Sequence, residues 1–322
     1  MNENGRAEGH DVVVVGAGAA GLSAALVLGR ARRRVAVVDA GEPRNAPAAH
    51  MQGFLSRDGM PPAALLAVGR EEVARYGVDL IDGRVEHIEP AGPAESGFTV
   101  HLAGGPVLHA RRVVVATGLR DDLPELPGLA ERWGKDVLHC PYCHGWEVRD
   151  RPLGVLGTGP WAVNQALLVR QWSADLVLFA HTLELTGADR ERLAARGVRV
   201  VEGRIVRLVA DGGRLRGIEL ASGEVVPREA VFVFPQPVPR DALLFGLDCA
   251  RDDHGWVTTD RTGRTSVPGV WAVGNVADPR AQVVVAAGTG AAAAFDLNHD
   301  LVDEEIGRAV ALGRASGVAL PA

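Results

Sequence analysis

A glycine-rich turn near the start of the chain constrains the fold more than any other feature. The apolar run Val12–Val15 is followed by Gly16-Ala17-Gly18-Ala19-Ala20-Gly21, an Ala/Leu-rich stretch, and a second apolar run that ends at Asp39. The first glycine permits a sharp turn, the second lets the backbone approach a pyrophosphate, and the third lets the next helix pack closely on its strand. A helix N-terminus stabilises phosphate charge, and an acid about 20 residues along suits a ribose hydroxyl. This order predicts a dinucleotide-binding βαβ unit.

A second glycine turn occurs in the middle of the chain. The run Gly154-Val-Leu-Gly157-Thr158-Gly159-Pro160-Trp161-Ala162 follows strand residues and precedes a helix expected at 163–172 and a strand at 176–179. Further apolar runs predict strands at 198–201, 205–209, 215–220 and 230–234. We therefore expect an α/β fold with two dinucleotide-binding, Rossmann-like domains, the second smaller and inserted into the first.

Two more apolar runs end in small or polar residues. Residues 112–118 close with Thr117-Gly118, and residues 269–275 close with Gly274-Asn275. The stretch Ala281–His299 is rich in Ala and Gly and predicts a long helix. Small residues would let the start of that helix approach a ligand closely, although a simple packing helix has the same composition.

Composition limits the class of protein. The chain has 322 residues, 47% hydrophobic and 23% charged, and is long enough for two globular domains. Its formal net charge is −6, without blocks of Lys or Arg, so we expect neither nucleic acid nor a membrane as partner. The run Val12–Val15 is too short for a signal peptide or a membrane span. We therefore expect a cytoplasmic protein.

The three cysteines point to redox chemistry. Cys140 and Cys143 form a CxxC motif within Cys140-Pro-Tyr-Cys143-His144, and Cys249 is expected to be a small buried residue without a role. The same letters match a c-type haem attachment site, a pair of zinc ligands with His139 nearby, and a glutaredoxin motif. No export signal and no second CxxC support the first two, and the surrounding chain is not a glutaredoxin. A redox-active disulfide beside a bound cofactor is favoured, and no metal site is predicted.

The spacing of this motif suggests how it works. Pro141 is favourable at a first helical position, which places Cys140 near an N-cap, where unpaired N–H groups stabilise a thiolate. A spacing of three residues brings both sulfurs to one helix face. His144 is the candidate general acid/base because imidazole titrates near neutral pH, and Glu147 is a candidate to orient it. A surface histidine without a role is the alternative for His144.

With these motifs in this order, the chain resembles the low-molecular-weight thioredoxin reductase family over nearly its whole length. The resemblance implies an FAD domain made of residues 1–120 and 244–322, an inserted NAD(P)-type domain of residues 121–243 that carries the CxxC, and a homodimer. The family usually has an acidic residue after the second cysteine, where this chain has His144. The variant looks more like the FAD-dependent dithiol oxidases that close disulfides in natural products such as holomycin and gliotoxin and pass electrons to oxygen.

The resemblance also assigns residues to roles. Cys140 would exchange disulfides with the substrate, and Cys143 would face the flavin. Asn275 replaces the usual aspartate beside the flavin ribitol, and His50 is a further candidate near the flavin. The FAD contacts implied are Gly16, Gly18, Ala19, Ala20, Gly21, Asp39, Val85, Thr117, Gly118, Gly274, Asn275, Gln282 and Val283.

The electron partner depends on the second turn. Pro160-Trp161 is a bulky pair where a pyrophosphate would approach, and Phe179-Ala-His-Thr182 offers no arginine for a 2'-phosphate. Arg190 and Arg192 lie further on, where they could reach back or form a solvated helix face. We interpret the NADPH site as degraded and predict an FAD-dependent oxidase that forms a disulfide in a small-molecule dithiol, with O2 reduced to H2O2. An NADPH-dependent thioredoxin or disulfide reductase is the alternative, and a non-catalytic FAD-binding regulator is a third.

Overall fold

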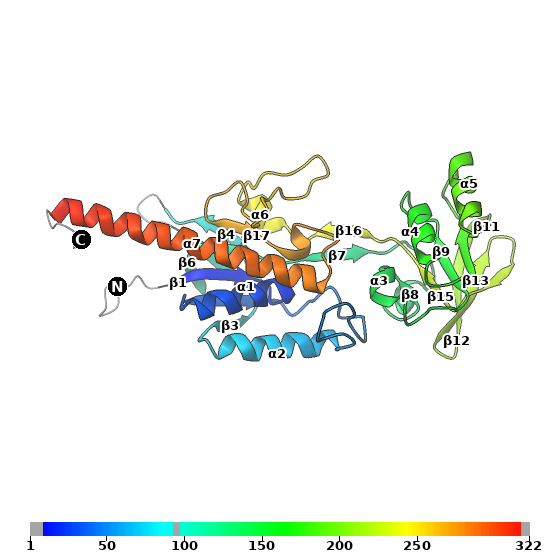
Figure 1. The fold of residues 1–322 in the computed structure, drawn as a ribbon, viewed down its shortest axis with the longest axis horizontal. Helices are drawn as coiled ribbons and strands as arrows, with labels where there is room; N and C mark the ends of the chain where they lie inside the picture. The colour runs from blue at the N-terminus through cyan, green and yellow to red at the C-terminus, as the bar shows by residue number, and fades with distance from the viewer. Residues whose placement is uncertain (1–8, 93–96, 317–322) are drawn as a thin grey trace. The chain divides into compact units, whose positions relative to one another are not determined.

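The computed structural model describes residues 9–92 and 97–316 (Figure 1). Its contacts divide the chain into two compact units. Unit 1 comprises Met1–Arg44, Ala63–Arg120 and Pro239–Ala322, and unit 2 comprises Asn45–Pro62 and Asp121–Val238. In each unit a strand with parallel neighbours leads into a glycine turn, His10–Val15 in unit 1 and Leu153–Leu156 in unit 2. The expected α/β fold, with two Rossmann-like domains and a discontinuous first domain, is confirmed.

One segment lies in a different unit from the one expected. Asn45–Pro62 groups with unit 2, although the sequence had suggested a continuous stretch 1–120 in the first domain. The Met51 N–H donates to the Met60 carbonyl at 2.9 Å, and the Gly59 N–H donates to the Met51 carbonyl at 2.9 Å. Pro47 lies so close to Gly134 that a Cβ on the glycine would stand 2.8 Å from the Pro47 carbonyl oxygen. The segment therefore joins unit 2 through contacts far apart in the sequence.

The sheet of unit 1 is built on buried valine runs. Its order is β3-β2-β1-β6-β5-β4, with β17 also paired to β6. The strands are β1 (His10–Val15), β2 (Val35–Asp39), β3 (Asp79–Asp82), β4 (Val85–Pro90), β5 (Phe98–Leu102), β6 (Val107–Val115) and β17 (Val270–Ala272). β3, β2, β1, β6 and β17 run parallel, and β5 is antiparallel to both β6 and β4. Val12–Val15 are at most 5% exposed, as expected for a central parallel strand covered on both faces.

The helices of unit 1 are α1 (Ala19–Arg30), α2 (Pro62–Ala74), α6 (Ala242–Gly246) and α7 (Val283–Ser316), with a 3-10 turn at Gly274–Val276. α1 and α7 lie side by side (Figure 1). They approach so closely that a Cβ on Gly290 would stand 2.0 Å from the Ala20 carbonyl oxygen.

The helix predicted at Ala281–His299 is confirmed but runs further, to Ser316. Ion pairs secure its second half: Glu305 pairs with Arg33 at 2.6 Å and with Arg111 at 2.7 Å, and Asp300 pairs with Arg112 at 2.6 Å. The prediction relied on small residues, which are frequent only in the first half of α7. The second half is charged, so the predicted C-terminal end of the helix came too early.

Unit 2 has a five-stranded parallel sheet in the order β11-β10-β9-β15-β8. Its strands are β8 (Val137–Leu138), β9 (Leu153–Leu156), β10 (Leu176–Phe179), β11 (Arg199–Val201) and β15 (Ala230–Phe232), and its helices are α3 (Pro141–His144), α4 (Ala162–Val169) and α5 (Gly187–Ala195), with a 3-10 turn at Ala130–Arg132. An antiparallel sheet adds β12 (Ile205–Asp211), β13 (Arg214–Leu220) and β14 (Val225–Pro227). The side chains of β9 alternate between two apolar clusters, with Leu153 and Val155 in one and Leu156 in the other.

The chain crosses between the units along two strands, β7 (Leu119–Asp122) and β16 (Gln236–Pro239), which pair with each other. Cys249 lies in a core cluster of unit 1, 6% exposed, and its thiol donates to Thr265 Oγ1 at 3.6 Å. Burial raises the pKa of the Cys249 thiol. The prediction that Cys249 is a buried residue is confirmed.

Candidate active site

The first glycine turn joins β1 to α1 and leaves its backbone open. Gly16 has φ 104°, and a Cβ there would stand 2.5 Å from the Ala116 carbonyl oxygen. A Cβ on Gly21 would stand 1.8 Å from the Gly16 carbonyl oxygen, so the strand and helix need both glycines. Around Gly18, in contrast, no described atom lies within 4 Å of where a Cβ would be. Gly18 is the N-cap of α1 and has no side chain to bond the first N–H groups. The turn can therefore admit a pyrophosphate.

Asp39 ends β2 and braces this turn. Its Oδ1 accepts a hydrogen bond from the Ala17 N–H at 3.1 Å. Its Oδ2 pairs with Arg70 at 3.2 Å. The carboxylate is thus fixed beside the turn, and its predicted contact with a ribose stays a prediction.

Other predicted cofactor residues meet at the same edge of this sheet. β1, β6 and β17 are parallel neighbours, so their carboxyl ends bring together the glycine turn, Thr117-Gly118 and Gly274-Asn275. A Cβ on Gly274 would stand 2.9 Å from the Ala20 Cβ. Gln282-Val283 leads into α7, and Val85 is buried at the start of β4. These positions suit one elongated ligand that runs across the edge, and their individual contacts remain predictions.

Asn275 has a structural reason to replace an aspartate. Its Nδ2 donates to the carbonyl oxygens of Asp278 and Ala281, both at 2.9 Å. Its Oδ1 accepts from Arg44 Nη1 at 3.3 Å. A carboxylate could not donate the first two bonds, so the amide holds the loop before α7.

The redox motif lies at the end of β8 in unit 2. Cys140 and Cys143 form a disulfide, with their Cα atoms 5.3 Å apart. Cys140 is the N-cap of α3, Pro141 takes the first helical position, and the Cys143 N–H donates to Cys140 Sγ at 3.2 Å. This is the local geometry that the spacing predicted. The tight fit of α3 depends on Gly145, where a Cβ would stand 2.8 Å from the Trp172 ring.

His144 follows Cys143 at the end of α3. It is half-buried, and its ring nitrogens make no hydrogen bond within residues 9–92 and 97–316. Burial lowers the pKa of His144 below its ordinary value, and the carboxylate of Glu147 opposes this in part. At neutral pH the imidazole is therefore unprotonated and can accept a proton from a thiol. His50, the other histidine noted in the sequence, is exposed in the Asn45–Pro62 segment.

The second glycine turn is as open as the first at its second glycine, since no described atom lies within 4 Å of where a Cβ on Gly159 would be; it differs from the first at Trp161. A Cβ on Gly157 would stand 2.4 Å from the Ala180 carbonyl oxygen, so a larger residue at this position would clash with the end of β10. Trp161 follows the turn and is 57% exposed. Its ring stacks on Phe234, with the ring centres 6.0 Å apart. An indole thus stands at the start of α4, close to where the pyrophosphate of a nucleotide would meet the helix.

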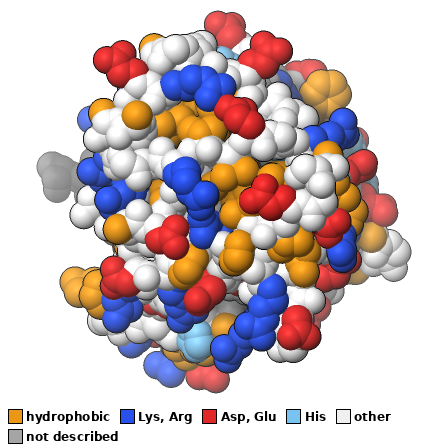
Figure 2. All heavy atoms as spheres, turned by 90° about the vertical axis from the view of Figure 1, so that its right-hand side faces the viewer, with side chains coloured by type: hydrophobic (Ala, Val, Ile, Leu, Met, Phe, Trp, Pro, Cys, Tyr) orange, Lys and Arg blue, Asp and Glu red, His pale blue; other side chains and the backbone are white. Residues whose placement is uncertain are grey.

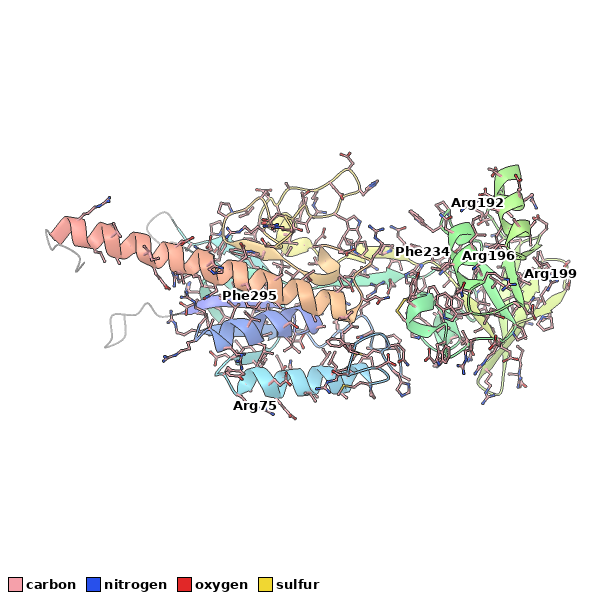
Figure 3. The ribbon with its side chains drawn as sticks, viewed as in Figure 1. Arg75, Arg192, Arg196, Arg199, Phe234 and Phe295 are labelled. Atoms are coloured by element: carbon pink, nitrogen blue, oxygen red, sulfur yellow. A yellow bond between two sulfur atoms is a disulfide. The ribbon has the colours of Figure 1, made fainter. Side chains whose placement is uncertain are left out.

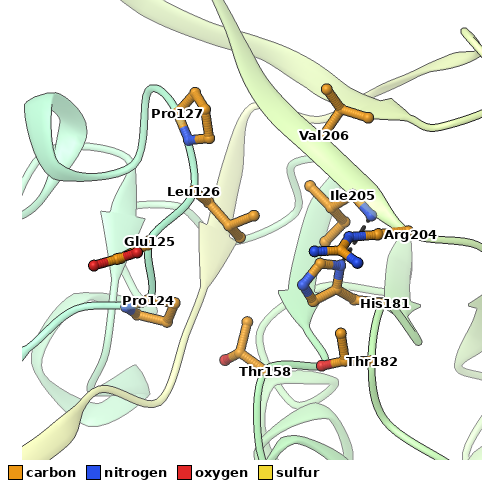
Figure 4. A pocket seen from close by; sticks show the side chains of 10 residues that line it. All are labelled: Pro124, Glu125, Leu126, Pro127, Thr158, His181, Thr182, Arg204, Ile205 and Val206. Atoms are coloured by element: carbon orange, nitrogen blue, oxygen red, sulfur yellow. Dashed lines mark hydrogen bonds between the residues drawn. The ribbon is translucent and has the colours of Figure 1, made fainter.

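A cavity of about 450 Å³ opens at the carboxyl ends of β9 and β10 (Figure 4). It is lined by Pro124, Glu125, Leu126, Pro127, Thr158, His181, Thr182, Arg204, Ile205 and Val206. The Ile205 N–H donates to His181 Nδ1 at 2.9 Å. Burial and the nearby Arg204 lower the pKa of His181. The Oγ1 of Thr158 is buried without a hydrogen-bond partner among the described residues. The cavity thus combines apolar side chains with the guanidinium of Arg204 and the carboxylate of Glu125.

Sequence reasoning missed Arg204 and considered two other arginines instead. Arg190 pairs with Glu202 at 2.6 Å, and Arg192 donates to Asn164 Oδ1 at 3.0 Å. Figure 3 labels Arg192 on α5. Both side chains are engaged with neighbouring elements. Arg204 reaches the cavity because β12 begins there, which no spacing along the chain reveals.

Comparisons with known proteins agree with this architecture. A model of the pyridine nucleotide-disulphide oxidoreductase family matches residues 10–291. "Thioredoxin reductase sirT" of Leptosphaeria maculans is 29% identical over 326 residues, covering 92% of this chain and 95% of the relative. A "Probable thioredoxin reductase" of Arthroderma benhamiae is 35% identical over 184 residues, which are 56% of this chain and about half, 46%, of that protein. The crystal structure of HlmI is 62% identical, with a TM-score of 0.94 over 97% of this chain and 99% of HlmI.

The chain belongs to the pyridine nucleotide-disulphide oxidoreductase family, and its resemblance to the thioredoxin reductases is confirmed. It is an FAD-binding flavoprotein and a thiol-disulfide oxidoreductase. The open glycine turn, the uncapped start of α1 and Asp39 fit the dinucleotide that this family binds.

Three further observations concern partners. No helix among the described residues is both long and apolar enough to cross a membrane. The same residues contain no group of three or more His, Cys, Asp or Glu placed to hold a metal ion. Figure 2 shows one face on which basic and acidic side chains alternate between hydrophobic patches.

Proposed function

We propose that the protein is an FAD-dependent dithiol oxidase that closes an intramolecular disulfide in a small-molecule dithiol, with O2 as the electron acceptor. The observation that carries the proposal is the Cys140–Cys143 disulfide at the N-terminus of α3, followed at once by His144, a half-buried imidazole whose pKa burial lowers. The sequence variant at His144 supports a dithiol oxidase rather than a thioredoxin reductase. Trp161, which stands where a nucleotide pyrophosphate would approach, supports oxygen rather than NADPH as partner.

The first half of the reaction uses this chain's own side chains. His144 accepts the proton of one substrate thiol, and the thiolate attacks Cys140 Sγ. The Cys140–Cys143 bond breaks, and Cys143 leaves as a thiolate. The second substrate thiol then loses its proton to solvent and attacks the substrate sulfur that is bound to Cys140, and Cys140 leaves as a thiolate. The substrate leaves as a disulfide, having lost two electrons and two protons, and the cysteine pair holds the electrons.

Two features of the motif favour these steps. The Cys143 N–H, which already donates to Cys140 Sγ, stabilises negative charge on that sulfur when it leaves. Pro141 fixes the start of α3 and keeps this N–H in place. Bound FAD would supply a two-electron acceptor for the reduced cysteines and a site for reoxidation by O2, which would give H2O2. The cradle residues of unit 1, above all Gly16, Gly18 and Gly21, would hold its pyrophosphate.

The proposal is tested by stoichiometry. A simple dithiol is mixed with the enzyme in air, and oxygen uptake, peroxide and remaining thiol are measured together. We expect one O2 consumed and one H2O2 formed for each substrate disulfide, without added NADPH. Dithiol-dependent oxygen uptake no faster than the enzyme-free rate would contradict the proposal.

An NADPH-dependent disulfide reductase is the second candidate, and Arg204 favours it. The guanidinium is exposed at the cavity beside the second glycine turn, where it could pair with a phosphate. In this reaction the same cysteines would pass electrons from the cofactor to a substrate disulfide. NADPH oxidation driven by a small disulfide, and lost in Arg204→Ala, would select this candidate over the oxidase.

We further propose a homodimer formed through α7. Phe295, Val302 and Ile306 are 59%, 37% and 56% exposed and lie at helical spacing, so they share one face. Figure 3 labels Phe295 on this helix. Burying such a face is favourable. Light scattering should give twice the chain mass of 33.9 kDa, and Phe295→Glu with Ile306→Glu should give the monomer. A monomeric wild type would contradict this proposal.

A cytoplasmic location is also proposed. Among the described cysteines the only disulfide is the CxxC pair, and Cys249 is a buried free thiol. A protein built without structural disulfides suits a reducing compartment. Fractionation of the native cells tests this location.

A further inference from the structure

The redox motif begins where β8 passes into α3 (Figure 1). β8 ends at Leu138, whose carbonyl accepts a hydrogen bond from the Val233 N–H at 2.8 Å. Cys140 is the N-cap of α3, so His139 alone separates the strand from the redox helix. The His139–Cys140 peptide group therefore lies beyond the pairing of β8 with β15, and contacts outside this ladder must hold its orientation.

A buried glutamine supplies such a contact. Gln165 of α4 is 7% exposed, and its Nε2 donates to the His139 carbonyl at 2.9 Å and to the Val233 carbonyl at 3.4 Å. The two carbonyl oxygens decide which end of the amide faces them, because the amide oxygen cannot donate. A peptide group is planar, so the bond to the His139 carbonyl also fixes the plane that contains the Cys140 nitrogen. Gln165 thus sets the direction of the backbone at the N-cap.

The other end of α3 is held by packing. Gly145 lies against the Trp172 ring, and the Tyr142 ring meets Trp172 edge-on, with the ring centres 5.6 Å apart. Trp172 comes from the turn after α4, so this helix and its C-terminal turn carry anchors for both ends of α3. The packing on Trp172 limits how far α3 lies from α4, whereas Gln165 acts on the His139 carbonyl.

The effect of Gln165 on stability is smaller than its two hydrogen bonds suggest. Its Oε1 is buried and has no hydrogen-bond partner among the described residues. An unsatisfied buried acceptor is destabilising and opposes the gain from the bonds that Nε2 donates. The clear effect of this side chain is therefore on the position of the His139 carbonyl.

We infer that Gln165 is a positioning residue of the redox site, which holds the His139 carbonyl and thereby keeps Cys140 at the N-cap of α3. In this position Cys140 Sγ accepts a hydrogen bond from the Cys143 N–H at 3.2 Å, and N–H groups at a helix N-terminus stabilise a thiolate. Without Gln165 the N-cap can rotate, and the sulfur spends less time within reach of this N–H. The Cys140 thiolate should then form at higher pH. The inference goes beyond the proposed function, because it concerns the reactivity of Cys140 whichever way electrons flow.

The test measures Cys140 by alkylation, without substrate or electron acceptor. In Cys143→Ser, Cys140 is the one thiol left in the motif, the backbone N–H at position 143 is retained, and Cys249 is buried. The reduced protein reacts with iodoacetamide at a series of pH values, and peptide mass spectrometry separates the two cysteine products. The rate at Cys140 rises with its thiolate fraction, so the midpoint of the pH profile reports thiolate formation.

Gln165→Met in this background should move the midpoint to higher pH. Below the midpoint it should slow alkylation of Cys140 about two- to tenfold, the range for the loss of one hydrogen bond. Methionine is also unbranched and fills the same space without a donor. Circular dichroism and the continued protection of Cys249 show that the variant is folded. If it is not, Gln165→Glu takes its place, because a carboxyl group carries at most one hydrogen for two carbonyls; it should move the midpoint in the same direction.

Asn164→Ala is the matched control. It removes the neighbouring amide of the same helix, which is exposed and accepts a hydrogen bond from Arg192 of α5 at 3.0 Å. It should leave both the rate and the midpoint at the values of Cys143→Ser. An unchanged midpoint in a folded Gln165 variant, or an equal change in Asn164→Ala, would overturn the inference. Neither result depends on oxygen uptake, so the proposed oxidase stands or fails separately.

Discussion

Gly290 is the residue at which a single methyl group should most clearly disturb the cofactor unit. A Cβ there would stand 2.0 Å from the Ala20 carbonyl oxygen, so α1 and α7 must separate by about 1 Å before the contact reaches 3.0 Å. Both partners are helix backbone and cannot rotate away. Overpacking of this kind costs about 3 kcal/mol, the upper part of its usual range. The higher helix propensity of alanine returns about 1 kcal/mol. Gly290→Ala should therefore destabilise unit 1 by about 2 kcal/mol.

Gly288 provides the matched control on the same helix. No described atom lies within 4 Å of where its Cβ would be, so Gly288→Ala should gain about 1 kcal/mol from helix propensity alone. Urea unfolding of the FAD-free proteins gives both values, and a titration with FAD gives the dissociation constants. We expect weaker FAD binding only in Gly290→Ala, because the residue it pushes, Ala20, belongs to the predicted cradle. Equal stability of the two variants would refute this account of the helix crossing.

Three more predictions follow from the redox site and the core. Cys143→Ser should retain FAD, measured by its absorbance, but lose dithiol turnover; full activity would contradict the proposed order of thiol exchange. In wild type, anaerobic reduction of the flavin by dithiol should slow as the pH falls through a pKa below 6.5, because His144 then becomes protonated; His144→Gln should lack this limb, and an unchanged profile would exclude His144 as the base. Burial alone would raise the pKa of Asp11, but hydrogen bonds from Arg34 and the charge of Arg111 hold it below 3.8, so its stabilising effect is present above pH 3.8 and is lost as the pH falls further. Acid titration of unfolding should show this loss in wild type and a smaller one in Asp11→Asn.

Features set by neighbouring residues could be predicted from the sequence. The two glycine turns, the valine strands and the position of Pro141 at the start of α3 all follow from local preferences, and the structure has them where expected. Cys140 and Cys143 form their disulfide because three residues of helix bring them together. These local features were sufficient to predict the fold class and the redox-active disulfide.

Features that depend on distant contacts could not be predicted in this way. Asn45–Pro62 joins unit 2 through packing such as that of Pro47 on Gly134. Arg204 reaches the cavity, and Phe234 stacks on Trp161, because strands far apart in the chain end at the same edge. The sequence predicted that Trp161 would obstruct a nucleotide, but it could not predict the contact of Trp161 with Phe234.

The direction of electron flow is tested most directly by anaerobic mixing of the yellow protein with NADPH and, separately, with a simple dithiol, followed by flavin absorbance. The account predicts bleaching by the dithiol alone and return of the colour when air is admitted. Rapid bleaching by NADPH would contradict it and would assign the cavity at Arg204 to a working nucleotide site.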